Sequence, residues 1–241
     1  MDQVENIRFP KFDFSEGEVL LIDKPLNWTS FDVVGKIRNS IKPLKVKVGH
    51  AGTLDPLASG LLILCTGKKT KTIDSLQAQE KEYTGTIYLG ATTPSYDLET
   101  EIDQQFDITD ITEKQIKETT QQFIGDIEQF PPSHSAIKIG GERLYEKARR
   151  GEDIERRARP VTINVFEITA INLPEISFRV ICSKGTYIRS LAHDFGKALH
   201  AGAYLSSLRR TRSGNFSVDD AYKVMELVNH IRSHKPETTT V

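Results

Sequence analysis

The sequence contains few of the residues that build metal centres and disulfide frameworks. Its 241 residues include two cysteines, two methionines and one tryptophan, and neither CxxC nor HExxH occurs. The six histidines are not spaced as zinc ligands are, and a glycine-rich phosphate loop is missing. We therefore expect a protein that needs neither a metal ion nor a cofactor.

Long apolar runs are missing as well. The longest, residues 61–65, is far too short to span a bilayer. The first residues are acidic and do not form a signal peptide. Cys65 and Cys182 both lie in apolar, strand-like segments, which favours buried free thiols over a disulfide. These features predict a cytoplasmic protein with no membrane contact, and we expect a monomer.

Charge is balanced overall but concentrated locally. The sequence has 32 lysines and arginines against 33 aspartates and glutamates, a net charge of −1. Basic residues gather at 42–47, 68–71, 138–159 and 209–212. For each cluster alone, a solvated and salt-bridged surface is an equal alternative. Because these clusters flank glycine-rich turns, together they favour contact with a phosphate backbone.

Hydrophobic periodicity predicts an α+β protein with a mixed, mostly antiparallel sheet. Strands are expected at residues 19–22, 83–89, 161–173, 176–182 and 204–212. Helices are expected from a cap at Thr29 or Ser30 to Ile41, at 69–77, 112–123 and 188–199, and from a cap at Ser217 through Val228. Residues 61–65 form a short buried element, and residues 91–110 are expected to be a loop.

Residues 125–160 differ from the rest of the chain. The FPP motif at 130–132 interrupts regular structure, Gly140 and Gly141 predict a turn, and a short basic helix is expected over residues 144–150. We interpret this region as an excursion from the main body and not as a core element. Residues 1–228 are then one domain that carries this inserted loop, followed by a flexible tail at 229–241.

Asp55 lies in the most informative segment, GHAGTLDP at residues 49–56. Gly49 and Gly52 permit backbone angles that other residues avoid. Pro56 restricts its own φ and disfavours the helical region for Asp55. The ordinary interpretation of an Asp-Pro pair is a turn. The alternative is a carboxylate held on a bend and directed at a ligand.

Three further segments favour the second interpretation. Tyr83 begins a strand in KEY at 81–83, where a core or edge tyrosine is the ordinary alternative. Arg189 follows a glycine turn in KGTYIR at 184–189 and lies on the first helical turn, where it can pair with a carboxylate or simply be exposed. Leu208 lies in LRR at 208–210, within an amphipathic strand.

Together these segments resemble the TruB family of tRNA pseudouridine synthases, which isomerise the T-loop uridine at tRNA position 55. The resemblance covers about residues 19–222. Its motifs are DKP at 23–25 with WTS at 28–30, GHAGTLDP, KEY, FPP with SA at 135–136, RLY at 143–145, KGTYIR and LRR. It implies the pseudouridine synthase fold, the tRNA T-arm as substrate, and a catalytic domain over residues 1–228 that uses neither metal nor cofactor.

The resemblance also implies roles for individual residues. Asp55 matches the catalytic nucleophile, Arg189 the arginine that pairs with it, and Tyr83 the aromatic residue that stacks on the flipped base. His50 matches the histidine that fills the space which the uridine leaves. The further substrate-binding residues that we expect are Tyr187, Leu208, Lys24, Thr53, Arg149 and Arg150. Residues 125–160 correspond to a loop that closes over the RNA.

The chemistry agrees with these roles. An enzyme that acts on a base inside a folded RNA must take that base out of its stack. One carboxylate can then form a covalent adduct, and an arginine keeps it ionised and oriented. A hydrolytic glycosidase needs two carboxylates, and the sequence offers no convincing second one. Attack at uracil C6 and attack at ribose C1′ both stay open.

Two other functions compete with this hypothesis. A non-catalytic RNA-binding or RNA-folding protein could use the same scaffold, although Asp55, Tyr83 and Arg189 argue for catalysis. An aspartyl-phosphate hydrolase would need Mg²⁺ and companion acids, and none flank Asp55. Few residues follow Tyr222, so we expect the C-terminal RNA-binding domain (PUA type) of many family members to be absent.

Overall fold

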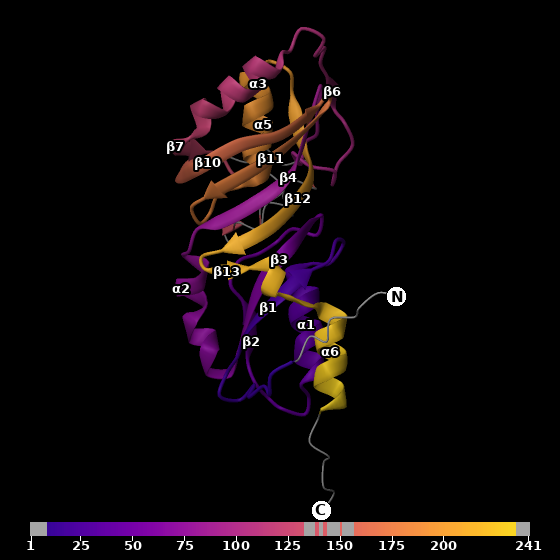
Figure 1. Ribbon diagram of the computed structural model, residues 1–241, viewed down its shortest axis with the longest axis vertical. Coiled ribbons are helices and arrows are strands. Elements are labelled where there is room, and N and C mark those ends of the chain that lie inside the picture. The colour runs from indigo at the N-terminus through magenta and orange to yellow at the C-terminus, as the bar shows by residue number, and fades with distance from the viewer. Residues whose placement is uncertain (1–8, 133–137, 140–141, 144–149, 151–156, 235–241) are drawn as a thin grey trace, which may run out of the picture. The chain divides into compact units, whose positions relative to one another are not determined.

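The structure is a computed structural model that describes residues 9–132, 138–139, 142–143, 150 and 157–234 (Figure 1). The chain forms two compact units. The first unit comprises residues 1–77 and 216–241, and the second comprises residues 78–215. No helix in the described ranges is both long and apolar enough to cross a membrane.

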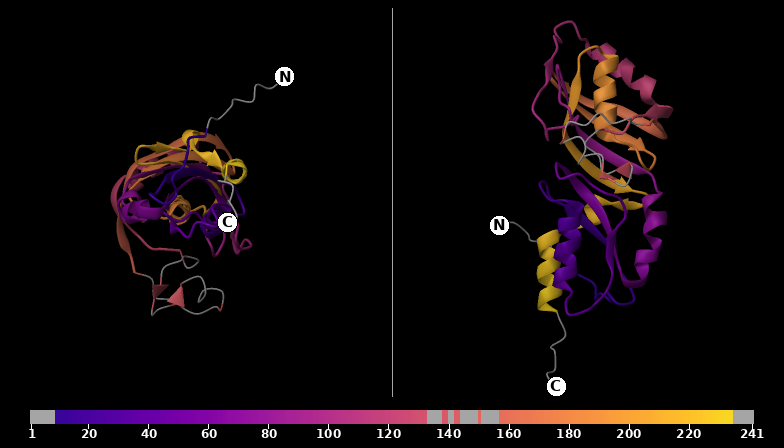
Figure 2. Two further views of the ribbon diagram at one scale, coloured as in Figure 1. Left: turned by 90° about the horizontal axis from the view of Figure 1, so that it is seen from below. Right: turned by 180° about the vertical axis from the view of Figure 1, so that it is seen from behind.

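A small mixed sheet organises the first unit. Strand β1 (Val19–Lys24) pairs antiparallel with β3 (Ala58–Thr66) and parallel with β14 (Tyr222–Lys223), and β2 (Val48–His50) pairs with β3. Helices α1 (Ser30–Ser40) and α6 (Val224–Ser233) pack side by side (Figures 1 and 2). The remaining elements are η1 (Gly67–Thr72), α2 (Ile73–Gln77), β13 (Phe216–Ser217) and η3 (Val218–Asp220).

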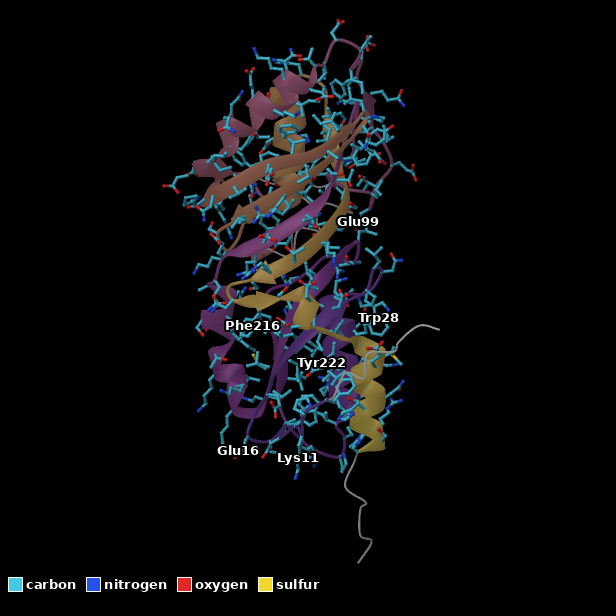
Figure 3. The ribbon with its side chains drawn as sticks, viewed as in Figure 1. Lys11, Glu16, Trp28, Glu99, Phe216 and Tyr222 are labelled. Atoms are coloured by element: carbon cyan, nitrogen blue, oxygen red, sulfur yellow. The ribbon has the colours of Figure 1, made fainter. Side chains whose placement is uncertain are left out.

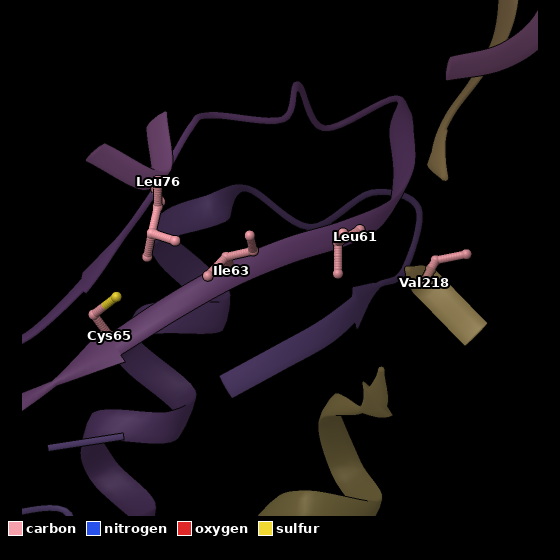
Figure 4. Packing of buried hydrophobic residues seen from close by; sticks show 6 residues of the cluster. Leu61, Ile63, Cys65, Leu76 and Val218 are labelled. Carbon is pink, nitrogen blue, oxygen red and sulfur yellow. The ribbon is translucent and has the colours of Figure 1, made fainter. Parts of the chain in front are cut away.

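The apolar run of β3 is buried on both faces of this sheet. Leu61, Ile63 and Cys65 point to one face, where they pack with Leu76 and Val218 (Figure 4). Leu62 and Leu64 point to the other and are equally inaccessible. A strand that is covered on both faces needs a continuous apolar sequence, whereas a half-exposed strand alternates.

A five-stranded antiparallel sheet organises the second unit. Its order is β12-β4-β11-β10-β7. The strands span Ala203–Ser213, Lys81–Leu89, Glu175–Cys182, Arg159–Asn172 and Gly125–Gln129, respectively. Two short hairpins accompany it, β5 (Ala91–Thr92) with β6 (Gln104–Gln105) and β8 (Lys138–Ile139) with β9 (Glu142–Arg143).

Helices cover one face of this sheet through aromatic contacts. The helical segments are α3 (Glu113–Thr119), the 3₁₀ turn η2 (Thr120–Phe123) and α5 (Ile188–Ala198). The Phe166 ring of β10 lies 5.3 Å from that of Phe195 on α5 and 6.2 Å from that of Phe178 on β11. Phe123 packs against the same cluster. The second core therefore lies between α5, η2 and the sheet.

The α+β class and the mostly antiparallel sheet are confirmed, with corrections at the level of elements. Of the helix expected at 69–77, only α2 is α-helical, after the 3₁₀ segment η1, and the loop expected at 91–110 contains the paired strands β5 and β6. Residues 125–129 form strand β7, which is paired along its length with β10, and are not an excursion. The last helix begins at Val224 and continues to Ser233, because Ser217 caps only a 3₁₀ turn. Most of the basic helix expected at 144–150 lies outside the described residues. The domain boundaries stay a prediction.

Two helical glycines allow a matched test of packing. A Cβ on Gly196 of α5 would meet Ala203 of β12 more closely than real Cβ atoms do, whereas a Cβ on Gly35 of α1 would meet no atom. We expect Gly196→Ala to lower the free energy of unfolding by about 1–3 kcal/mol through overpacking. We expect Gly35→Ala to raise it by about 0.5–1 kcal/mol, since alanine favours the helix.

Urea denaturation followed by circular dichroism measures both values. A Gly196→Ala variant as stable as wild type, or more stable, would mean that α5 does not depend on the close contact between Gly196 and Ala203.

Candidate active site

The Asp55 bend is held from both sides by the backbone of the first unit. Ser30 Oγ accepts a hydrogen bond from Leu54 N (2.9 Å) and donates one to Leu54 O (3.1 Å). Asn27 N donates to Pro56 O (2.8 Å), and Ala58 N donates to Asp55 O (3.0 Å). Leu54 is buried and Asp55 is half-buried. The carboxylate thus projects from a backbone whose neighbours are fixed by hydrogen bonds.

The two glycines before Asp55 act differently. Gly52 has φ +109°, a conformation that L side chains rarely adopt, as the sequence predicted. Gly49 is an ordinary β2 residue whose φ lies outside that region, so the expectation for it was wrong. A Cβ at Gly49 would lie 2.8 Å from the Ile73 side chain. A side chain at position 49 would therefore displace the end of the Ile73 side chain.

The N-terminus of α1 is rigid, which matters because it carries Ser30. Thr29 and Asp32 form a capping box, in which Asp32 N donates to Thr29 Oγ1 (3.0 Å) and Thr29 N donates to Asp32 Oδ2 (2.8 Å). The Thr29 hydroxyl and N–H hold the pKa of Asp32 below its usual range. The predicted cap at Thr29 is confirmed.

Lys24 is fully buried at the turn between β1 and α1. Its Nζ donates to Trp28 O (2.6 Å) and Pro25 O (2.9 Å), and Figure 3 labels Trp28 at this turn. A lysine that is bonded to carbonyl groups of its own turn stabilises that turn. Its direct contact with substrate stays a prediction.

His50 and Thr53 lie on either side of the Gly52 turn in the first unit. His50 is half-buried and Thr53 is exposed. The His50 ring meets the edge of Phe31, with ring centroids 5.9 Å apart. Phe31 is 69% exposed, unusually high for an aromatic residue beside a candidate site. Sequence analysis missed Phe31 because it was treated as one more position of an amphipathic helix.

Arg189 is held in the second unit by a carboxylate that sequence analysis did not identify. Its Nη1 lies 3.6 Å from Asp97 Oδ2, and it donates to Ser95 O (3.3 Å). The two side chains are 5% and 8% exposed. A charge this well buried needs a partner of opposite sign. Asp97 supplies it from the polar segment 91–110, which showed no periodic pattern.

The turn around Asp97 is itself tightly bonded. The Asp97 carbonyl accepts from Thr93 Oγ1 (2.7 Å) and Ser95 Oγ (3.1 Å). Oδ1 of the Asp97 side chain accepts from Glu99 N (2.9 Å). Asp97 is therefore positioned by its own loop before it meets Arg189.

The end of β7 fixes the start of α5. Gln129 is 2% exposed, and its side-chain amide both accepts from Tyr187 N (2.7 Å) and donates to Tyr187 O (3.0 Å). Ser190 Oγ donates to Phe130 O (2.8 Å). These bonds set the backbone on both sides of Arg189. Gln129 also escaped sequence analysis, since it was assigned to the excursion.

Strand register places the predicted pocket residues of the second unit on one sheet face. Leu208 pairs with Gly85, and Arg210 pairs with Tyr83, so their side chains lie on the same side of the sheet. Tyr83 is buried and Leu208 is half-buried. Phe178 also pairs with Gly85 and lies on this face. Since Phe178 contacts Phe166, which contacts Phe195 of α5, this is the face that α5 covers.

The basic clusters are only partly surfaces for phosphate. Lys42, Lys45 and Lys47 are exposed, as expected. Lys68 pairs with Glu16 at 2.7 Å.

Arg210 is 2% exposed, so its assignment to a surface cluster was wrong. Arg150 is exposed, whereas Arg149 lies outside the described residues.

The predicted residues fall into two groups, one in each unit. The first group is Lys24, His50, Thr53 and Asp55, and the second is Tyr83, Tyr187, Arg189 and Leu208. The first supplies a half-buried carboxylate on a fixed bend. The second supplies a buried guanidinium, an aromatic ring and an apolar side chain on one face of a sheet. The pairing of Arg189 with Asp55 stays a prediction.

Sequence comparison identifies related families and proteins. Residues 38–188 match the TruB family pseudouridylate synthase (N terminal domain), and residues 189–240 match the tRNA pseudouridylate synthase B C-terminal domain. The chain is 61% identical over 217 residues to tRNA pseudouridine synthase B of Flavobacterium johnsoniae, covering 88% of this chain and 95% of that one. It is 54% identical over 216 residues to the protein of that name from Phocaeicola vulgatus, covering 88% and 92%.

Solved structures agree in fold. A Cbf5-Nop10-Gar1 complex matches with a TM-score of 0.70 and 34% identity, covering 90% of this chain and 54% of that chain. An H/ACA RNP bound to a substrate RNA containing 2′-deoxyuridine matches with a TM-score of 0.66 and 31% identity, covering 89% and 53%. The chain thus spans about half the length of each matched chain.

Lys81 gives this region a measurable pH dependence. It is 6% exposed on β4, and burial, together with the charge of Arg210, lowers its pKa to about 8. Between about pH 8 and 10.5 the unfolded chain holds a proton that the folded chain has lost. The contribution of Lys81 to the free energy of unfolding should therefore rise across this window, by on the order of 2–3 kcal/mol.

The difference in the free energy of unfolding between wild type and Lys81→Met, measured by urea unfolding from pH 7 to 10.5, isolates this contribution, which the variant should lack. Lys114→Met, at an exposed lysine of α3, serves as the control and should keep it. Parallel curves for wild type and Lys81→Met would contradict the assignment.

Proposed function

The chain belongs to the TruB family of pseudouridylate synthases, and we propose that it isomerises the T-loop uridine at tRNA position 55 to pseudouridine with Asp55 as the nucleophile. The observation that carries the proposal is the Asp55 bend, whose flanking residues are fixed by Ser30 and Asn27. A nucleophile works best on a backbone that needs no rearrangement when the substrate arrives. The relatives named tRNA pseudouridine synthase B support the same activity.

The reaction moves one glycosidic bond. The uridine leaves its stack, and the Asp55 carboxylate attacks the base or the sugar to form a covalent adduct. The N1–C1′ bond breaks, the uracil rotates, and a C5–C1′ bond forms. The proton on C5 is lost and N1 gains one, so the product has the composition of the substrate. The sum of these steps is an isomerisation.

The other residues have roles that follow from their chemistry. Tyr83 offers a ring on which the flipped uracil stacks, with Leu208 and Tyr187 as further pocket walls. His50 fills the space left in the RNA. Arg189 carries a positive charge that keeps a nearby carboxylate ionised. Lys24, Thr53 and the exposed Arg150 complete the proposed contacts with RNA, together with Arg149.

We also propose that the protein acts as a monomer in the cytoplasm on the tRNA T-arm. Cys65 and Cys182 are both free and buried, which suits a reducing compartment. Burial raises the pKa of the Cys182 thiol to about 11, so this thiol is not a nucleophile at neutral pH. Light scattering with and without tRNA measures the oligomeric state.

Replacing the nucleophile should abolish turnover and preserve binding. We expect Asp55→Asn to lower kcat by at least about a thousandfold, because an amide cannot attack. The RNA affinity should stay close to that of wild type. Asp74→Asn, at an exposed position of α2, is the matched control and should be fully active.

Quantitative mapping of pseudouridine in an unmodified tRNA transcript, with fluorescence anisotropy for affinity, tests both expectations. Pseudouridine formed by a preparation free of wild-type enzyme and of deamidated protein would remove Asp55 from the mechanism.

Asp97 should affect the chemical step through Arg189. We expect Asp97→Asn to lower kcat by about tenfold or more, since a guanidinium without its carboxylate loses its orientation, while KM changes little. Glu99→Gln removes a charge from the same turn at an exposed position (Figure 3) and should leave kcat unchanged.

Kinetics on a T-arm stem-loop and urea unfolding of both variants separate the two possible roles of Asp97. A normal kcat combined with reduced stability would mean that Asp97 serves only the fold.

A further inference from the structure

A cavity of about 510 Å³ lies in the second unit between α5 and the segment 92–106. Tyr96, Asp103 and Phe106 line it from the segment. His193, Lys197 and His200 line it from α5 and the residues that follow. This volume is typical of small-molecule sites, and none of these six residues takes part in the function proposed above.

An aromatic pair forms one part of the cavity wall. The rings of Tyr96 and His193 stack with centroids 3.9 Å apart and planes inclined by 15°. Tyr96 has φ +64°, which is uncommon for a residue other than glycine. Its N–H donates to Thr93 O (3.1 Å) and its carbonyl accepts from Leu205 N (2.9 Å). The loop thus holds the backbone of Tyr96 in a costly conformation, and such conformations cluster at binding and active sites.

Charges of opposite sign line different parts of the cavity. His193 and Lys197 are one turn apart on α5, so they lie on one face of it, and His200 lines the cavity from just after the helix. Asp103 comes from the opposite segment, and its Oδ1 accepts from Thr92 Oγ1 (2.6 Å). The cationic side can bind a phosphate. The carboxylate can accept from the exocyclic amino group of a base.

We propose that this cavity binds one unpaired nucleotide of the substrate RNA, other than the target uridine. Its base stacks on the Tyr96–His193 pair, and its phosphate contacts Lys197. Aromatic platforms and cationic side chains together are the usual means by which proteins hold single-stranded nucleotides. The proposal rests on the proposed function, because that function supplies an RNA loop with unpaired bases.

The cavity is linked to the candidate active site through short covalent paths. Tyr96 lies between Ser95, whose carbonyl accepts from Arg189 Nη1, and Asp97, which pairs with Arg189. His193 is one helical turn after Arg189 on α5. A nucleotide on the Tyr96–His193 pair would therefore stabilise the arrangement that positions Arg189. The bound RNA would affect both affinity and the chemical step.

The test combines protein variants with RNAs that lack single bases. Wild type, Tyr96→Leu and Lys197→Gln are each measured on a T-arm stem-loop and on a series with one abasic site at each unpaired position except the target. Tyr88→Leu and Lys114→Gln are matched controls elsewhere in the second unit. Fluorescence anisotropy gives Kd, and single-turnover mapping gives the rate of pseudouridine formation.

We expect Tyr96→Leu to weaken binding of the intact stem-loop by about tenfold, as expected for the loss of one stacked base. At one unpaired position, removal of the base should weaken binding by wild type by the same factor. Wild type and Tyr96→Leu should bind this abasic RNA with the same Kd. Lys197→Gln should reduce the slope of log K against log salt by about 0.7–0.9. Both controls should behave as wild type.

The proposal is overturned if every abasic RNA is bound more weakly by Tyr96→Leu than by wild type by the same factor. Nucleoside monophosphates form a second arm. If they bind wild type and lose affinity in Tyr96→Leu while no abasic position shows coupling, the cavity takes a free nucleotide and the RNA assignment is wrong.

The same data separate this inference from the proposed function. Coupling at one abasic position, without pseudouridine formation by wild type, would retain the cavity and remove the activity. Normal pseudouridine formation by wild type, without such coupling, would retain the activity and overturn the assignment of the cavity.

Discussion

The buried charge of Arg189 is the constraint on which the second unit depends. A guanidinium that is 4% exposed costs several kcal/mol unless carboxylate and carbonyl groups surround it. Asp97 and Ser95 meet this need from one loop, and Gln129 fixes the start of α5 from another. Three segments distant in sequence therefore determine where this one side chain lies.

The first unit positions its functional group by a different means. Asp55 owes its place to hydrogen bonds from the Ser30 hydroxyl and the Asn27 N–H and to the left-handed Gly52. The capping box of α1 holds Ser30 in turn. Such bonds orient the peptide that carries the carboxylate. One unit thus positions its functional charge by a buried ion pair, and the other positions its functional charge through a bend fixed by hydrogen bonds.

Sequence reasoning succeeded where local physics decides the outcome. The Thr29 cap, the strands expected at 161–173 and 176–182 and the helix beginning at Ile188 depend on neighbours a few residues away, and each is present. It failed for β7, because GDIEQ has weak strand character and becomes a strand only by pairing with β10. It also failed for Asp97, Gln129 and Phe31, whose importance depends on contacts with distant segments or on exposure.

By itself the sequence determined the α+β class, the family, the Asp55 bend and the identity of most candidate residues, because these follow from periodicity, turn chemistry and ordered motifs. Only the tertiary structure decided that Lys24 and Arg210 are buried, that Gly49 packs against Ile73 with an ordinary φ, and that Arg189 pairs with Asp97. The physical reason is that burial and charge pairing arise between segments far apart in the chain. A pattern of neighbouring residues carries no information on which distant carboxylate will meet a given arginine.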